Sequence, residues 1–266
     1  MAMGSGKNNL KKIVVLSLVI PVIGFVVLDL GLPSQRWTSI PFHAILETIG
    51  LTVGLITALF LLSTNPGNQE VRSISGWIAA ALIGMGILDG FHAAVLPGNT
   101  AVWLHSMSAL TGGALFTGIW WGRRMQKKTP GSYIAGAVAL GAVALFAIVL
   151  GMVSIAFPDV VPFITMNTAF PLLADGLNVT GGALFVIAAA GLYFLSMKAE
   201  VWEFSLFSVF CMLNGLAGLF FPFTISWTAG WWFWHCVRLA AYLLLLIFLY
   251  TMFISPSRRS CTLAGG

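Results

Sequence analysis

The chain divides into eight apolar segments, each long enough to cross a lipid bilayer as a helix. A hydrocarbon core of about 30 Å needs roughly 20 apolar residues of α-helix. Only 8% of the 266 residues are charged, whereas soluble domains carry about 25% charged residues. The sequence therefore predicts an all-α, polytopic integral membrane bundle surrounded by lipid, with about eight transmembrane helices. The expected spans are 13–32, 41–63, 75–96, 101–121, 131–157, 173–196, 204–224 and 232–254.

The cations predict how this bundle is oriented, because cytoplasmic loops of membrane proteins retain Lys and Arg. With the N-terminus inside, 11 of the 13 Lys and Arg fall on the inner side: Lys7, Lys11, Lys12, Arg72, Arg123, Arg124, Lys127, Lys128, Lys198, Arg258 and Arg259. Both termini are therefore expected to be cytoplasmic. The expected organisation is a cytoplasmic segment 1–12, one transmembrane bundle 13–254 and a cytoplasmic tail 255–266.

Several classes of function have no support in the sequence. The three cysteines, Cys211, Cys236 and Cys261, form no C-x-x-C pair, so neither a thiolate zinc site nor a disulfide framework is expected. No phosphate-binding loop, nucleophile elbow or H-E-x-x-H motif is present. Charges are so few that the net charge of +5 indicates topology, and no nucleic-acid partner is expected.

The hexapeptide TGGALF occurs twice, at 111–116 and at 180–185, in two spans predicted to run in the same direction. Glycine pairs allow helix backbones to approach closely in lipid. The repeat is explained either by two independent packing faces of small residues or by duplication of a helical hairpin.

All four histidines fall in one layer near the outer ends of the predicted spans. At 1.5 Å per residue, residues three or four apart share a helix face, so His43 pairs with Glu47, and Asp89 pairs with His92. Arg238 follows His235 by one turn. The predicted ligand- or cofactor-binding residues are His43, Glu47, Asp89, His92, His105, Asp175, Asn178, His235 and Arg238.

Charged side chains are costly inside a span, at about 2.5–3.5 kcal/mol for a position near the helix centre. Glu47, Asp89 and Arg238 should therefore face the bundle interior and either pair or be neutralised by a shifted pKa. The layer is either a functional site or a structural polar network. As a site, its four histidines are candidate ligands for Zn, Cu or Fe, or for haem b between two imidazoles. Four tryptophans near the last span are most simply an outer aromatic belt, with cofactor stacking as the alternative: Trp227, Trp231, Trp232 and Trp234.

These motifs resemble the bacterial membrane-associated sensor domains of the MASE type, which are input modules of diguanylate cyclases and histidine kinases. The resemblance is carried by FHAILETIGLTVGLITALF, GMGILDGFHAAV, WLHSMSALTGG and WWFWHCVRLAAYLLLLIFLY. It implies a signal-transduction module of the bacterial inner membrane. Such a module binds a small ligand, a metal, haem or protons and relays binding to a cytoplasmic signalling domain or partner protein, with a homodimer as one assembly. Because no catalytic output domain follows residue 254, we expect a sensor rather than an enzyme.

Two other classes compete with this interpretation. Ser39, His43 and Asp89 superficially resemble part of the intramembrane ceramidase and adiponectin-receptor pattern, an intramembrane zinc-dependent hydrolase, although HCVRL in the last span lacks the second histidine of that pattern. A transporter or a haem and quinone redox protein is the third class. Its polar path is not evident, because the fifth and seventh spans contain few polar residues: Ser154, Ser205, Ser208 and Asn214.

Overall fold

The computed structural model describes residues 2–32, 35–64, 69–128, 133–162, 171–199 and 203–263. Over these ranges the chain is helical apart from its turns and one isolated bridge between Arg36 and Thr228. The all-α prediction is thus confirmed. The long helices are α1 (Ala2–Gly31), α2 (Ile40–Ser63), α3 (Gln69–Ala94), α4 (Asn99–Lys128), α5 (Tyr133–Ala156), α6 (Pro171–Ala199), α7 (Glu203–Phe220) and α8 (Ala229–Leu263), with short 3-10 turns η1 (Pro158–Val160) and η2 (Phe221–Phe223).

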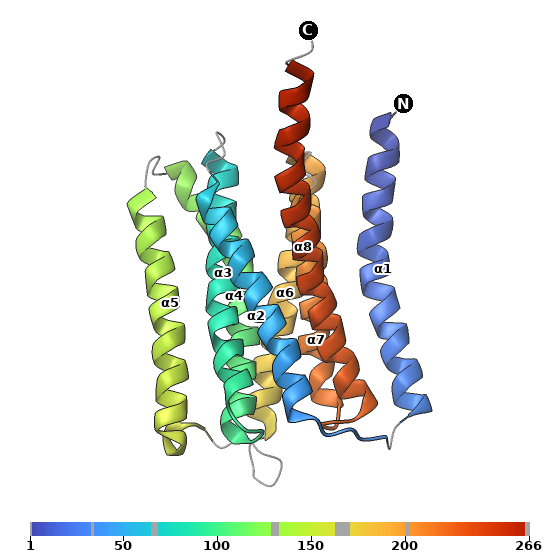
Figure 1. Ribbon diagram of the computed structural model, residues 1–266, viewed down its shortest axis with the longest axis vertical. Coiled ribbons are helices and arrows are strands. Elements are labelled where there is room, and N and C mark those ends of the chain that lie inside the picture. The colour runs from blue at the N-terminus through green and yellow to red at the C-terminus, as the bar shows by residue number, and fades with distance from the viewer. Residues whose placement is uncertain are drawn as a thin grey trace.

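Seven of these helices are long and apolar enough to cross a membrane: α1, α2, α3, α5, α6, α7 and α8. Length and composition therefore give the described chain the character of a multi-pass helical membrane protein. The eighth long helix, α4, stands in the same bundle beside α3 and α6 (Figure 1). Its described part is less apolar because it carries His105 and several Ser, Thr and Gly residues.

The bundle has a packed centre and two peripheral helices. Helix α7 is the most enclosed, with most of its side chains buried, and it packs against α6, α8 and α1. Helices α1 and α5 stand on opposite sides of the bundle (Figure 1) and expose many large apolar side chains, as lipid-facing helices do. The first turn of α1 and the last turn of α8 lie at the same end of the bundle (Figure 1).

The two TGGALF copies meet each other where α4 crosses α6. Gly113 faces the backbone of Gly181, and a Cβ atom added to Gly181 would lie 2.6 Å from the carbonyl oxygen of Ala109. A Cβ added to Gly182 would lie 2.8 Å from the carbonyl oxygen of Gly215 on α7. Both copies thus act as small-residue packing faces, and they pack against each other. Glycine here allows three helix backbones to approach closely.

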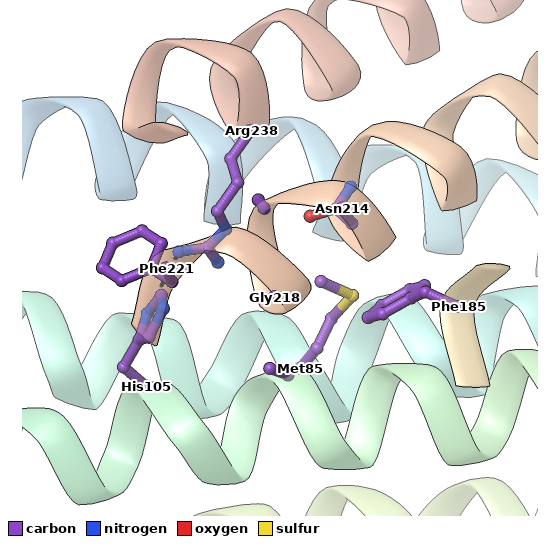
Figure 2. A pocket seen from close by; sticks show the side chains of 9 residues that line it. Met85, His105, Phe185, Asn214, Gly218, Phe221 and Arg238 are labelled. Carbon is purple, nitrogen blue, oxygen red and sulfur yellow. Dashed lines mark hydrogen bonds between the residues drawn. The ribbon is translucent and has the colours of Figure 1, made fainter. Parts of the chain in front are cut away.

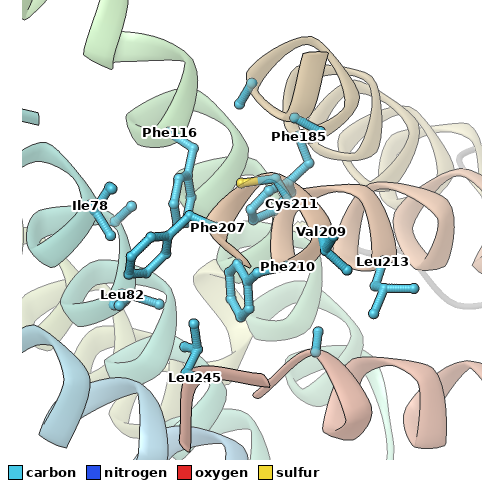
Figure 3. Close-up of a cluster of buried hydrophobic side chains, with 14 of the residues drawn as sticks. Ile78, Leu82, Phe116, Phe185, Phe207, Val209, Phe210, Cys211, Leu213 and Leu245 are labelled. Carbon is cyan, nitrogen blue, oxygen red and sulfur yellow. The ribbon is translucent and has the colours of Figure 1, made fainter. Parts of the chain in front are cut away.

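A cluster of buried hydrophobic side chains lies next to this crossing (Figure 3). Phe116 lies with its ring centroid 5.6 Å from those of Phe185 and Phe210, and all three side chains are fully buried. Phe207 belongs to the same cluster. Eleven residues separate Phe116 from His105 on α4, which is on the order of 16 Å of helix. The phenylalanines around Phe116 are therefore well removed from His105.

Candidate ligand-binding cluster

The structure brings all four histidines together at the end of the bundle opposite the first turn of α1. His43 lies in the first turn of α2, His92 in the last turn of α3, His105 near the start of α4 and His235 near the start of α8. Adjacent rings have centroids 4.8–5.1 Å apart, from His235 to His43 to His92 to His105. Each side chain is buried. Helix ends from four separate segments thus form one polar layer inside an apolar bundle.

Local sequence explains why two of these histidines sit where they do. Helix α2 starts with Pro41 in its first turn, and the His43 amide donates to the carbonyl oxygen of Ser39 at 3.0 Å. Proline suits this position because the first amides of a helix have no partner within it. Trp227 precedes α8 with a positive φ of 69°, and its carbonyl accepts the Trp37 amide at 2.9 Å. The two connections leading into α2 and α8 are thereby held side by side.

Three imidazole nitrogens converge within this layer. The Nε2 atom of His43 lies 3.1 Å from Nε2 of His235 and 3.3 Å from Nε2 of His92. The other nitrogens of the two outer rings are held by backbone carbonyls: Nδ1 of His92 lies 2.7 Å from the oxygen of Ala101, and Nδ1 of His235 lies 2.9 Å from that of Trp231. We call His43, His92 and His235 the histidine triad.

Arg238 is the centre of an adjoining ion network. Its Nη2 donates to Oδ2 of Asp89 at 2.7 Å, and its Nη1 donates to Oε1 of Glu47 at 3.1 Å. The predicted interior pairing of these three residues is found in the structure. Glu47 also borders the histidine triad, since its Oε1 lies 3.6 Å from Nε2 of His235 and 4.0 Å from Nε2 of His43. Glu47 therefore joins the two halves of the cluster.

The charges of this network do not balance. Glu47 and Asp89 are buried acids, at 6% and 1% exposed, and Arg238 is the one cation paired with them in the described part of the chain. Two carboxylates and one guanidinium leave one negative charge when the imidazoles are neutral. In addition, Oδ1 of Asp89 has no hydrogen-bond partner among the described residues. Unbalanced buried charge is costly, so a cation or a proton fits this layer.

His105 belongs to the ion network and not to the triad. Its Nδ1 accepts a hydrogen bond from Nη1 of Arg238 at 3.1 Å. Figure 2 shows His105 and Arg238 at one edge of a small cavity that is also lined by Met85, Asn214 and Phe221. The cavity volume is about 10 Å³, which is close to the space that one water molecule needs.

Tryptophans of α8 and of the connection that precedes it pack against the histidine triad. The Trp231 ring lies 3.8 Å from that of His235 and 5.1 Å from that of His43. Trp231 and Trp232 are buried, and Trp234 is fully buried and stacked 5.3 Å from Phe220. The predicted aromatic belt is therefore wrong for these three residues, because their rings pack inside the bundle. Trp227 is half-buried and also borders His43.

Two predicted residues lie apart from this assembly. Asp175 is only partly buried, and among the described residues no hydrogen bond or ion pair joins it to the cluster. Asn178 donates to Oγ of Ser106 at 2.9 Å and to the carbonyl oxygen of Ala174 at 3.0 Å, which ties α6 to α4. The sequence reasoning missed the carbonyls of Ala101 and Trp231. Trp231 lies one turn before His235, which is a usable signal, but nothing in the sequence marks Ala101.

The donor set fits some candidate ligands better than others. Two metal–nitrogen bonds of about 2.0–2.1 Å at a tetrahedral angle place the nitrogens about 3.3–3.4 Å apart, close to the spacings at His43. Haem b held by two imidazoles needs nitrogens about 4 Å apart on opposite faces of the iron, whereas the nitrogen pairs at His43 are 3.1 and 3.3 Å apart. The spacing at His43 therefore suits a single ion better than haem b. The hydrolase ligand set with Asp89 is not assembled, because Asp89 faces Arg238.

Fold and cluster together define the class: a helical protein of membrane-spanning type with a buried site of histidines, carboxylates and one arginine. Comparisons with protein-family models, with curated proteins and with solved structures found no match to this chain. The resemblance to MASE-type sensor domains therefore stays a prediction.

Proposed function

We propose that the protein is a membrane-embedded sensory module, oriented with both termini in the cytoplasm of a bacterium, that binds a small ligand at the cluster and relays its binding through α8. The outer leaflet then surrounds the cluster. The cations described at the opposite end, Lys12, Arg72 and Lys198, support this orientation. The other predicted inner cations, including Arg123 and Arg258, have side chains outside the described part.

The observation that carries this proposal is the position of α8. This helix supplies both His235 to the triad and Arg238 to the ion network. It is 35 residues long, or roughly 52 Å at 1.5 Å per residue, and it extends beyond its membrane-crossing segment Ala229–Met252 (Figure 1). A change in the contacts of His235 or Arg238 therefore acts on a helix that reaches the far side of the bundle. A signalling domain or partner protein there is the expected receiver.

The apolar core favours relay over transport. Phe116, Phe185, Phe207 and Phe210 pack together in the interior of the bundle (Figure 3). The polar side chains of α7 in this region bond to nearby carbonyls: Ser208 to Ala189 and Asn214 to Phe210. This apolar packing favours relay through α8 over passage of an ion through the bundle.

Distance measurements between spin labels test the relay. Cysteines are placed at Leu59 on α2 and Tyr250 on α8, both exposed and remote from the cluster, after replacement of Cys211, Cys236 and Cys261. Zn²⁺, Ni²⁺ and a change to mildly acid pH serve as separate probes. We expect at least one probe to shift the α2–α8 distance distribution. A control pair at Leu59 and Phe194 on α6 should stay unchanged. An α2–α8 distance that responds to none of the probes would sink the proposal.

A further inference from the structure

We infer that the ligand of this cluster is a divalent transition-metal ion of the zinc type, bound by the Nε2 atoms of His43, His92 and His235 together with the Glu47 carboxylate. The inference rests on the proposed function, since it names the ligand class of the same site. Its first support is distance: the Nε2 atom of His43 is 3.1 and 3.3 Å from those of its two neighbours. Both nitrogen pairs that include His43 thus have about the spacing of two ligands at a tetrahedral metal site.

The second support is the protonation pattern that the backbone imposes. Carbonyl oxygens only accept hydrogen bonds, so the carbonyls of Ala101 and Trp231 require the hydrogen to be on Nδ1 of His92 and of His235. In the neutral rings, Nε2 then carries a lone pair. Metal-binding histidines are usually held in this way, with the second ring nitrogen donating to a carbonyl or carboxylate.

These two lone pairs have too few donors without an ion. Both aim at Nε2 of His43, which carries at most one hydrogen. That hydrogen satisfies one neighbour and leaves the other lone pair facing a nitrogen at hydrogen-bond distance. A metal ion removes the conflict, because all three Nε2 atoms then donate electron pairs to the same centre.

Glu47 supplies the oxygen and the charge. His43, Glu47 and His92 offer ligand atoms that all lie within 4.8 Å of one another. The excess negative charge of the network makes a cation the ligand class that fits. Imidazole nitrogens select Zn, Cu, Ni or Fe over Mg and Ca, which prefer all-oxygen sites. Arg238, which holds Glu47 at 3.1 Å, orients the carboxylate and links the ion to α8.

His105 provides a matched control within the same layer. It is as buried as His43, at 8% exposed, and its ring adjoins that of His92. Its Nδ1 is engaged by Arg238, so it lies outside the ligand set. His105→Ala therefore measures the effect of removing a buried imidazole that is not a proposed ligand, and variants of the triad measure the loss of a proposed metal ligand.

The test is zinc binding by the full chain in detergent, purified without a histidine tag and depleted of metal. We expect one Zn²⁺ per chain, measured by competition with a chromophoric chelator. His43→Ala, His92→Ala and His235→Ala should each weaken zinc binding by roughly 100-fold or more, and Glu47→Gln by about 10–100-fold. His105→Ala should cost no more than about tenfold, the lower limit for outer partners of metal ligands.

A measurement on the unmodified chain covers the case in which a variant does not fold. X-ray absorption at the zinc edge should give nitrogen and oxygen neighbours at about 2.0–2.2 Å with the multiple scattering of several imidazoles. The inference is overturned if the unmodified chain takes up no zinc, if no more than one imidazole is bound, or if His105→Ala weakens binding as much as His43→Ala. Zinc uptake without movement of α8 would refute the relay alone. Movement of α8 in acid without zinc uptake would refute the metal assignment alone.

Discussion

Two positions on α4, His105 and Gly113, are both buried, but they hold the bundle together in opposite ways. Near the start of the helix, His105 takes part in a network of charges and imidazoles. Further along the same helix, Gly113 lies against the backbone of Gly181 with no polar side chain involved. Close backbone packing stabilises without charge, so it needs no ligand. The polar layer is stable only as far as its charges are paired. It contains a nitrogen lone pair without a hydrogen-bond donor and one uncompensated negative charge. We therefore expect the packing of α4 against α6 at the glycine crossing to stay the same on ligand binding, and the contacts within the cluster to change.

The largest expected effect comes from removing the cation of the ion network. Arg238→Met leaves the carboxylates of Glu47 and Asp89 buried without their arginine, which should lower the free energy of unfolding by about 3–5 kcal/mol. Thermal unfolding in detergent measures this loss. The matched change Arg36→Met, at an exposed arginine, should have little effect. Equal losses in both variants would show that the buried network does not depend on Arg238.

The triple variant Arg238→Met, Glu47→Gln, Asp89→Asn sharpens the same point. It removes the charges together and should recover part of the stability lost in Arg238→Met, because no uncompensated carboxylate remains. Unfolding curves of the two variants in the same detergent give the comparison. A triple variant less stable than Arg238→Met would mean that the carboxylates stabilise through contacts other than charge.

The glycine crossing should respond to added volume. The new Cβ of Gly181→Ala would lie 2.6 Å from the Ala109 carbonyl oxygen, and separating the two backbones should cost about 1–3 kcal/mol. Gly141→Ala on α5 is the control, since nothing lies within 4 Å of its added Cβ. There the substitution should stabilise the helix by up to about 1 kcal/mol. Thermal unfolding that places both variants on the same side of the unmodified protein would contradict the close crossing.

A smaller loss is expected where tryptophans cover the cluster. Trp232→Phe removes the hydrogen bond from Nε1 to the Trp37 carbonyl oxygen, which is 2.8 Å long, and should lower stability by about 0.5–1.5 kcal/mol. Trp121→Phe alters a ring that is 71% exposed and should be nearly neutral. The two variants are compared by thermal unfolding. A neutral Trp232→Phe would mean that the α1–α2 connection is not held through this bond.

The smallest effect is expected at Asp175, which lies outside the proposed site. Asp175→Asn should change stability by less than about 0.5 kcal/mol, as is usual for partly exposed positions without close partners. Its zinc affinity should equal that of the unmodified chain, in contrast to Glu47→Gln. Chelator competition and thermal unfolding test both statements. A large loss of zinc affinity in Asp175→Asn would extend the site to α6.

Sequence reasoning predicted the depth of the cluster residues better than their partners. His43, His92, His105 and His235 were expected in one layer, and they lie in one layer, because residue number times helix rise gives the depth of a residue in a span. The pairing of Glu47 and Asp89 with Arg238 followed from the cost of charge in lipid. The exclusion of His105 from the triad and the isolation of Asp175 were not predictable, since both depend on how each helix is rotated about its axis.

The aromatic-belt prediction for the tryptophans was wrong for a related reason. In a soluble protein an apolar stripe marks the buried face of a helix, but in a bilayer the lipid and the protein core are both apolar. Trp121, exposed on α4, and Trp234, buried on α8, therefore sit in equally apolar sequence. The position of a tryptophan along the chain indicates which end of a span it lies near. It does not indicate whether its side chain faces the lipid or the protein interior.

The sequence by itself determined the helical class, the approximate positions of the long helices and the common depth of the polar residues, because these follow from the apolar length, the helix rise and the alternation of the spans. It did not determine all helix ends, since α1 begins at Ala2 and α8 continues to Leu263. Only the tertiary structure decided that the imidazoles of His92 and His235 converge on that of His43, that carbonyls of Ala101 and Trp231 orient both of them, and that Arg238 engages His105. These contacts depend on lateral order and helix rotation. Close packing at residues such as Gly113 and Gly181 sets both.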